Sequence, residues 1–191
     1  MATYFIADLH LGHVHILSYD NRPFKTIQEH DYYIVNQWKN IVTDEDDIYI
    51  LGDVSWHTHK QTIDIIKMLP GKKHLIIGNH DKDVLKKPAF RELFVEICDY
   101  KELKLDKVVS IVLSHYPIPC FNKHYYGWYH FYGHVHDSFE AHMMERIKKE
   151  MEDLYDKPCN MFNVGAMMGH MNYTPRTFEE IIGSEEDVDD V

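Results

Sequence analysis

The sequence lacks the features that mark secreted and membrane-spanning proteins. Its three cysteines are odd in number, scattered and without CxxC spacing, so neither a disulfide framework nor a thiolate metal site is indicated. No stretch approaches the roughly 18 uncharged apolar residues that a membrane span needs. The N-terminus MATYFIADLH has no basic segment followed by an apolar run and a cleavage site. We therefore expect a soluble, cytoplasmic protein that makes no contact with a membrane.

An excess of basic charge is also absent. The chain has 20 Lys and Arg against 31 Asp and Glu, which gives a formal net charge of −11. Tight binding to duplex nucleic acid rests on Lys and Arg side chains that neutralise phosphates. The charge balance therefore disfavours strong duplex binding. Part of the acidic excess lies in residues 184–191, which we expect to form a disordered tail.

The remaining chain has the length and composition of one globular domain. Of its 191 residues, 45% are hydrophobic, and we find neither internal repeats nor a low-complexity linker. A chain of this length supports one sizeable core but hardly two. We therefore expect a single domain over residues 1–183, and one site that carries the function.

Hydrophobic patterning in the first half predicts strands that alternate with helices. Strands are expected at 3–7, 48–51 and 74–77. One helix opens at the capping-box pattern Thr26-Ile27-Gln28-Glu29 and runs to about Val42, and a second covers about 60–69. This order predicts parallel strands with helices packed against them.

After Phe94 the strand-like runs follow one another and indicate a second sheet. They cover residues 96–105, 108–114, 129–133 and 161–165, the last ending in a turn. Apolar residues at helical spacing predict a helix over about 138–155. A capping pattern at 177–180 predicts one short final helix.

Five short motifs follow the predicted strands: DLH at 8–10, GD at 52–53, GNHD at 78–81, SH at 114–115 and GHVH at 133–136. One such motif alone is more often a cap or a turn. Ligands bind beyond the carboxyl ends of parallel strands, so the five could converge. Together they supply nitrogen and oxygen ligands suited to first-row divalent metals. The two-residue spacing within DLH and within HVH would place each pair on one face of an extended chain.

This ordered set resembles the signature of the calcineurin-like metallophosphoesterases, and it spans about two thirds of the chain. The resemblance implies an α/β fold: a four-layer α/β/β/α sandwich of mixed sheets with helices on the outer faces. It also implies two divalent metal ions. Mn is our first choice, while Fe, Zn, Ni and Co accept the same ligands.

The resemblance assigns the motif residues to two metal ions that share one carboxylate. One ion would be held by Asp8, His10, Asp53 and His136. The other would be held by Asp53, Asn79, His115 and His134. A bridging carboxylate keeps two cations about 3.5 to 4 Å apart, the spacing of two-metal hydrolases. In the same resemblance His80 is the catalytic histidine, and Asp81 orients it.

These expectations predict an enzyme that hydrolyses a small phosphodiester or nucleotide-like phosphate ester with a metal-activated hydroxide. One alternative is a nuclease for single strands or ends, which would need a basic flanking surface. Another is a non-catalytic protein-binding scaffold in which the metal site has decayed, but the presence of His80 favours catalysis. The sequence leaves the choice between monoester and diester, and the oligomeric state, open.

Two residues outside the motifs, Arg22 and Trp128, each allow two interpretations. Arg22 could clamp a phosphate oxygen, or it could be a surface arginine before a turn. Trp128, in the aromatic stretch 116–132, could stack on a nucleobase or could pack in the core. Ten of the fifteen histidines lie outside the motifs, and we expect them at the surface or in packing roles. Four of these stand close to the motifs: His13, His15, His57 and His59.

Overall fold

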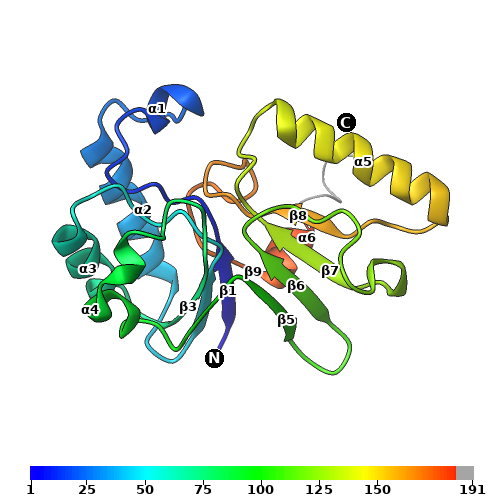
Figure 1. Cartoon of the computed structure of the whole chain (residues 1–191), viewed down its shortest axis with the longest axis horizontal. Coiled ribbons are helices and arrows are strands. Elements are labelled where there is room, and N and C mark those ends of the chain that lie inside the picture. The colour runs from blue at the N-terminus through cyan, green and yellow to red at the C-terminus, as the bar shows by residue number, and fades with distance from the viewer. Residues whose placement is uncertain (184–191) are drawn as a thin grey trace.

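The protein is a mixed α/β fold with two mixed sheets, described here by a computed structural model of residues 1–183 (Figure 1). The expected acidic tail, 184–191, lies outside the described residues. The five-stranded sheet has the order β4-β3-β2-β1-β9 and the four-stranded sheet the order β5-β6-β7-β8. The strands are β1 (Thr3–Ile6), β2 (Asp47–Ile50), β3 (Lys72–Ile76), β4 (Glu96–Cys98), β5 (Tyr100–Lys104), β6 (Ser110–Ser114), β7 (Tyr129–Tyr132), β8 (Met161–Asn163) and β9 (Arg176–Thr177).

Helices pack against both sheets. They are α1 (Ile16–Tyr19), α2 (Ile27–Ile41), α3 (His59–Met68), α4 (Pro88–Arg91), α5 (Phe139–Tyr155) and α6 (Phe178–Gly183), with the short 3-10 turns η1 (Val84–Lys86) and η2 (His124–Tyr126). Figure 1 shows α2, α3 and α4 beside the five-stranded sheet and α5 beside the four-stranded one. None of the helices within residues 1–183 is both long and apolar enough to cross a membrane.

The predicted alternation of strands and helices in the first half is confirmed. Strands β1, β2, β3 and β4 pair in parallel. Helix α2 begins where the capping pattern placed it, because the Thr26 side chain accepts a hydrogen bond from the Glu29 amide at 3.2 Å. Helix α6 begins with the reciprocal pair, in which Thr177 and Glu180 each accept from the other's backbone amide.

The prediction that every strand after Phe94 belongs to a second sheet is wrong for the run 96–105. This run divides at Asp99: β4 pairs in parallel with β3, whereas β5 pairs antiparallel with β6. Hydrophobic periodicity indicates extended chain but not the partner strand, so the change of sheet left no mark in the pattern. Strand β9, which pairs antiparallel with β1, was also missed.

One hydrophobic core joins the two sheets. Phe5 of β1 meets Phe131 of β7 edge to face, with ring centroids 5.0 Å apart, and both are fully buried. The same cluster includes Trp38 of α2 and Ile66 of α3. A smaller cluster, which includes Met151 of α5, lies under α5. This packing is compatible with an α/β sandwich and fixes the strand ends from which the site is built.

Candidate metal centre

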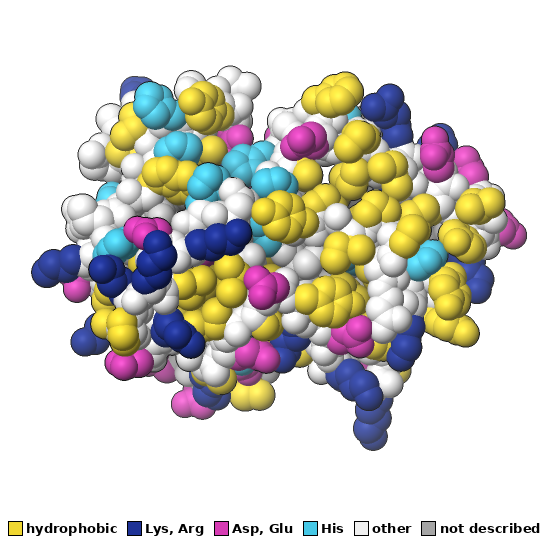
Figure 2. All heavy atoms as spheres, in the orientation of Figure 1, with side chains coloured by type: hydrophobic (Ala, Val, Ile, Leu, Met, Phe, Trp, Pro, Cys, Tyr) yellow, Lys and Arg dark blue, Asp and Glu magenta, His cyan; other side chains and the backbone are white. Residues whose placement is uncertain are grey.

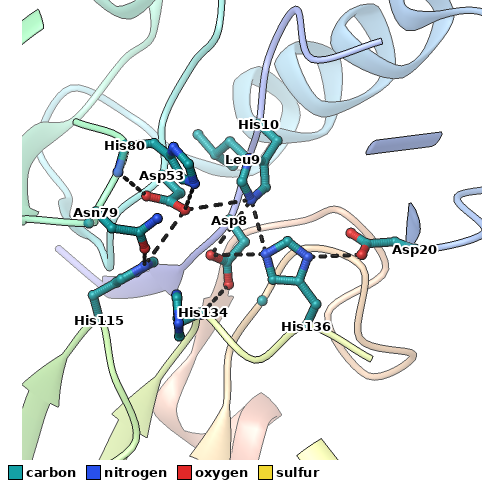
Figure 3. A network of polar contacts seen from close by, with 12 residues as sticks. Asp8, Leu9, His10, Asp20, Asp53, Asn79, His80, His115, His134 and His136 are labelled. Carbon is teal, nitrogen blue, oxygen red and sulfur yellow. Dashed lines mark hydrogen bonds and ion pairs between the residues drawn. The ribbon is translucent and has the colours of Figure 1, made fainter. Parts of the chain in front are cut away.

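The structure brings all seven candidate ligands to one edge of the two sheets (Figure 3). Asp8 and His10 follow β1, Asp53 follows β2, Asn79 follows β3, His115 follows β6, and His134 and His136 follow β7. Parallel strands end at the same edge of a sheet, so their loops meet there. Residues more than 100 positions apart in the sequence therefore share one site.

Most of the candidate ligands have an unusual backbone conformation. Five of the seven adopt left-handed φ angles: Asp8 54°, His10 48°, Asp53 55°, His134 69° and His136 50°. Such angles are uncommon for residues other than glycine and cost about 1 to 3 kcal/mol each where the surroundings impose them. The expected extended geometry of the DLH and HVH pairs is therefore wrong. Left-handed backbone concentrated at one place is typical of functional sites.

The loops approach one another so closely that glycine is required at two positions. A Cβ on Gly133 would meet the Asp8 carboxylate, and a Cβ on Gly78 would meet the side chain and amide of Asp53. Both glycines precede a candidate ligand in the chain. They allow the two loops to press against the carboxylates of the neighbouring loops.

The first group of ligand atoms comes from Asp8, His10 and His136. The Nε2 atoms of the two histidines lie 3.0 Å apart, and the Asp8 Oδ1 atom is 3.7 Å from His136 Nε2 and 4.0 Å from His10 Nε2. Burial, followed by the nearby positive charges, holds the pKa of His10 well below its ordinary range. Its imidazole is therefore neutral, which is the form that binds metals.

The second group comes from Asp8, Asp53 and His115. The Asp53 Oδ2 atom is 3.7 Å from His115 Nε2 and 3.8 Å from His10 Nε2. It thus lies between one histidine of each group. Asn79 joins the second group through its Oδ1 atom, 2.9 Å from His115 Nε2. Asp8 belongs to both groups, so the two carboxylates together connect them.

His134 lies beside these groups without belonging to either. Its ring meets that of His115 edge to face at 5.1 Å, and its backbone amide donates to Asp8 Oδ2 at 2.9 Å. Burial lowers the pKa of His134, and the charge of His115 lowers it further. A neutral imidazole beside the second group is available as a further ligand.

A buried, unpaired oxygen tests whether these residues fit a cation. Asp8 is fully buried, and its Oδ1 atom has no hydrogen-bond donor. Burial raises the pKa of this carboxyl group to about 6. A buried carboxylate oxygen without a donor is unfavourable unless a positive charge faces it. Because Asp8 is common to both groups of ligand atoms, the donor set fits divalent cations.

Asp20 supports the site and was not predicted from the sequence, where no motif includes it. Its Oδ1 atom lies 2.8 Å from His136 Nδ1. Burial opposes the charged form of His136, but the hydrogen bond to Asp20 and the charges of Asp8 and Asp20 outweigh it and raise its pKa. The contact also directs Nε2 of His136 toward the first group.

Arg22 is neither at the surface nor free to clamp a phosphate, so both predictions made for it from the sequence are wrong. It is 4% exposed, and four acceptor atoms in the protein engage its guanidinium group. Its Nε atom donates to Asp20 Oδ2 at 3.0 Å, and its Nη2 atom lies 2.9 Å from the same oxygen in an ion pair. Nη2 also donates to the Asp8 carbonyl at 3.0 Å. Its Nη1 atom contacts the Leu9 carbonyl and His30 Nε2 at 3.3 and 2.8 Å. Arg22 therefore holds the DLH loop and Asp20 in place.

His80 is the most exposed of the five motif histidines. Its side chain is 46% exposed, its Nε2 atom lies 3.9 Å from Asp53 Oδ2, and its ring centroid is 4.1 Å from that of Trp56. Asp81 does not orient it. The Asp81 carboxylate instead accepts from the backbone amides of Asp53, Val54 and Gly78 at 2.8 to 3.0 Å. It holds the GD and GNHD loops together, because it accepts from backbone amides of both loops.

A cavity of about 340 Å³ opens onto these groups. Six of its lining residues are motif residues: His10, Asp53, Asn79, His80, His134 and His136. The other four were not assigned to the site from the sequence: His13, Ile16, Tyr19 and Trp56. Trp128 does not line it; this side chain packs against the cluster under α5, and the Lys123 ammonium lies over its ring. The stacking role expected for Trp128 is therefore not supported by its position.

The remaining histidines near the motifs have local contacts. His57 Nε2 lies 2.7 Å from Asp31 Oδ2, and His59 Nε2 lies 2.8 Å from Asp83 Oδ2. His15 is exposed and stacks on Tyr19. These positions agree with the expected surface and packing roles, whereas His13 lines the cavity.

The fold and site describe a mixed α/β protein with two connected groups of candidate metal ligands. No family model matches the chain. The uncharacterized protein MJ1445 of Methanocaldococcus jannaschii is 33% identical over 135 residues, which cover 70% of this chain and 68% of that protein. The chain belongs to the same family as MJ1445. The gene 66 protein of Mycobacterium phage D29 is 30% identical over 60% of this chain and 63% of its own length.

Among solved structures, the protein of unknown function AQ665 from Aquifex aeolicus has the same overall fold. It aligns with 96% of this chain and 98% of its own at a TM-score of 0.62 and 25% identity. The Pseudomonas putida nuclease MPE aligns with 70% of this chain and 60% of its own at 20% identity. Its TM-score of 0.41 is too low to establish a shared fold.

Proposed function

We propose that this protein is a calcineurin-like metallophosphoesterase that uses two divalent metal ions to hydrolyse a phosphate ester. The observation that carries the proposal is the position of Asp53 Oδ2, which lies 3.8 Å from His10 Nε2 and 3.7 Å from His115 Nε2, one histidine from each proposed ion site. In two-metal hydrolases the two metal sites lie close together, and one carboxylate can serve both. The four-layer sandwich of that family is part of the same proposal.

We take the proposed ligand sets from the resemblance to the metallophosphoesterase signature. Asp8, His10 and His136, with Asp53, would hold one ion, and Asp53, Asn79, His115 and His134 would hold the other. Manganese is our first choice, and Fe, Zn, Ni or Co suit the same nitrogen and oxygen donors. When bound in such sites, metal ions lower the pKa of water to give a hydroxide nucleophile and stabilise charge on a phosphate.

The chain itself positions the substrate and handles the leaving group. His80 stands at the edge of the cavity with its Nε2 atom toward Asp53 and part of its ring open to solvent. From there it can donate a hydrogen bond to a phosphate oxygen, or a proton to the departing alkoxide. Asp81 acts through the backbone, because it fixes the loops that carry Asp53 and His80.

The favoured substrate is a small phosphodiester or nucleotide-like phosphate ester. A cavity of about 340 Å³ suits a small molecule, and the net charge of −11 opposes duplex binding. A nuclease that acts on single strands or ends is a second candidate, because exposed basic residues follow the GNHD motif: Lys82, Lys86, Lys87 and Arg91. In Figure 2, Lys and Arg side chains gather beside the histidines on one face. A protein-binding scaffold with a decayed site is disfavoured by the complete set of ligands.

A metal-by-substrate screen tests the proposal. Metal-stripped protein, verified by elemental analysis, is assayed with each metal against bis-p-nitrophenyl phosphate, p-nitrophenyl phosphate, cyclic nucleotides and single-stranded DNA. We expect no hydrolysis without metal and the strongest recovery with Mn, on a small ester. Full activity of the metal-free protein would overturn the proposal, and preference for single-stranded DNA would select the nuclease.

Two variants separate metal binding from chemistry. Asp53→Asn should reduce the occupancy of both ions, because Asp53 lies between His10 and His115. His80→Ala should keep both ions and lose turnover. If His80→Ala instead loses a metal ion, the role assigned to His80 is wrong.

A further inference from the structure

Four residues outside the motifs also line the cavity, and three of them carry aromatic rings. We call His13, Ile16, Tyr19 and Trp56 the aromatic wall. The His13 ring stacks on Trp56 with centroids 4.3 Å apart and planes at 17°, and it meets Tyr19 at 6.1 Å. Figure 2 shows histidine and hydrophobic side chains side by side in one area of the face. None of the four is a carboxylate, lysine or arginine, so the wall favours neutral organic groups.

The chain segments that carry the wall are tied together before any ligand binds. Trp56 donates its backbone amide to the Leu11 carbonyl at 2.7 Å. The Asp31 Oδ2 atom accepts from the Gly12 amide at 3.0 Å and lies 2.7 Å from His57 Nε2. One carboxylate thus joins the loop before His13 to the loop after Trp56. A preformed surface binds with a smaller entropy loss than a flexible one.

The wall is also next to the place where a phosphate would lie. The Trp56 ring centroid is 4.9 Å from that of His10 and 4.1 Å from that of His80. A phosphate held by the proposed metal ligands would therefore have its ester group within reach of the wall. Trp56 and Tyr19 remain 37% and 71% exposed, so part of each ring is free to contact that group.

We propose that the aromatic wall binds a planar ring in the ester group of the substrate, and so makes the protein selective for aryl or nucleoside phosphate esters. This inference rests on the proposed phosphoesterase function. Stacking on aromatic side chains needs no positive charge and accepts any planar ring, because each ring has a π face. In this proposal the wall takes the stacking role that the sequence analysis considered for Trp128.

The test measures binding without turnover. Manganese-loaded protein is titrated by calorimetry with three phosphonates, in which a P–C bond replaces the ester linkage, so that they bind without being hydrolysed. They are methylphosphonate, benzylphosphonate and the 5′-methylenephosphonate of adenosine. We expect both ring-bearing compounds to bind about 5-fold or more tightly than methylphosphonate. Tighter binding of the adenosine compound than of benzylphosphonate would identify a nucleobase, and the reverse order an aryl group.

Variants of the wall residues test whether the aromatic wall causes the ring preference. Tyr19→Ala and Trp56→Ala should each reduce the ring preference, and the double variant should abolish it, with methylphosphonate binding retained. Tyr32→Ala is the matched control, because Tyr32 on α2 is also 71% exposed but does not line the cavity. Tyr19→Ala should fold normally, because the Tyr19 side chain is exposed. The ring preference is a ratio of two affinities measured on the same variant, so a loss of stability does not change it.

The outcomes separate this inference from the proposed function. A wild-type protein without ring preference, or a double variant that keeps it, overturns the role of the wall even if esters are hydrolysed. A ring preference that the double variant loses supports the wall even if no ester in the screen is hydrolysed, in which case only the phosphoesterase proposal fails.

Discussion

His10 and His136, separated by 126 positions in the sequence, bring their Nε2 atoms within 3.0 Å of each other (Figure 3). The Nδ1 atom of His136 is engaged with Asp20 at 2.8 Å. An Nδ1–H bond to that carboxylate leaves a lone pair on Nε2 of His136. Two imidazole nitrogens that face each other beside a buried carboxylate oxygen are suited to share a cation.

The first prediction is that this histidine pair makes stability depend on metal. Excess Mn should raise the melting temperature of metal-stripped protein, since a ligand at 100 times its Kd adds about 2.7 kcal/mol. His10→Ala or His136→Ala should lose most of that shift. Differential scanning fluorimetry over a Mn titration measures it, with His142→Ala on the exposed face of α5 as control. An unchanged shift in both ligand variants would contradict the assignment.

The second prediction concerns the unpaired oxygen of Asp8. Asp8→Asn should stabilise the metal-free protein by about 1 to 3 kcal/mol at pH 7.5, because it removes a buried negative charge. An asparagine oxygen can still accept from the His134 amide, as Asp8 Oδ2 does. The same variant should lose the stabilisation by Mn. Urea unfolding with and without Mn measures the free energy of unfolding of both proteins and so checks both changes. A metal-free variant less stable than the wild type would show that Asp8 has a structural role instead.

The third prediction is that Asp20 sets metal affinity without touching the metal. Asp20→Asn weakens the hydrogen bond that orients His136, and such changes typically lower affinity by about 10- to 100-fold. Calorimetric titration with Mn gives the Kd. Asp83→Asn is the matched control, because Asp83 pairs with His59 at the same 2.8 Å distance on the surface. Equal Kd values for the two variants would remove Asp20 from the site.

The fourth prediction is an acid sensitivity that originates at His130, away from the metal ligands. This buried imidazole accepts from the Ile118 amide at 3.0 Å and donates to the Val112 carbonyl at 3.0 Å, so a second proton would face the Ile118 N–H. Burial lowers the pKa of His130 to about 4. Between pH 6.5 and 4 the unfolded chain binds the proton and the folded chain does not, so stability is lost as the pH falls through this window.

The size of that loss is about 3 kcal/mol, from the difference between the two pKa values. His130→Gln keeps one acceptor and one donor but does not titrate. Urea unfolding of both proteins from pH 7.5 to 4 should therefore give a steeper loss for the wild type. Parallel curves would show that His130 does not control the acid response.

Much of the secondary structure and the chemistry of the site could be predicted from the sequence. The periodicities of strand and helix are local, as are the caps at Thr26 and Thr177, so β1, β2, β3 and the helices α2, α3 and α5 lay where they were expected. The motifs could be located because each follows a predicted strand, and the resemblance to the metallophosphoesterase signature named the candidate ligands within them. Their left-handed φ angles could not be predicted, since only the surrounding loops impose them.

The sequence by itself determined which residue types are available: carboxylates, imidazoles and an amide at the ends of strands. Only the tertiary structure decided which of them meet and which residues surround them. Arg22 is buried because the Asp8 and Leu9 carbonyls and Asp20 take its donors. Trp56, rather than Trp128, lines the cavity because the loop after β2 pairs with Leu11 in the loop after β1. Such contacts join distant segments, and no local pattern in the chain encodes them.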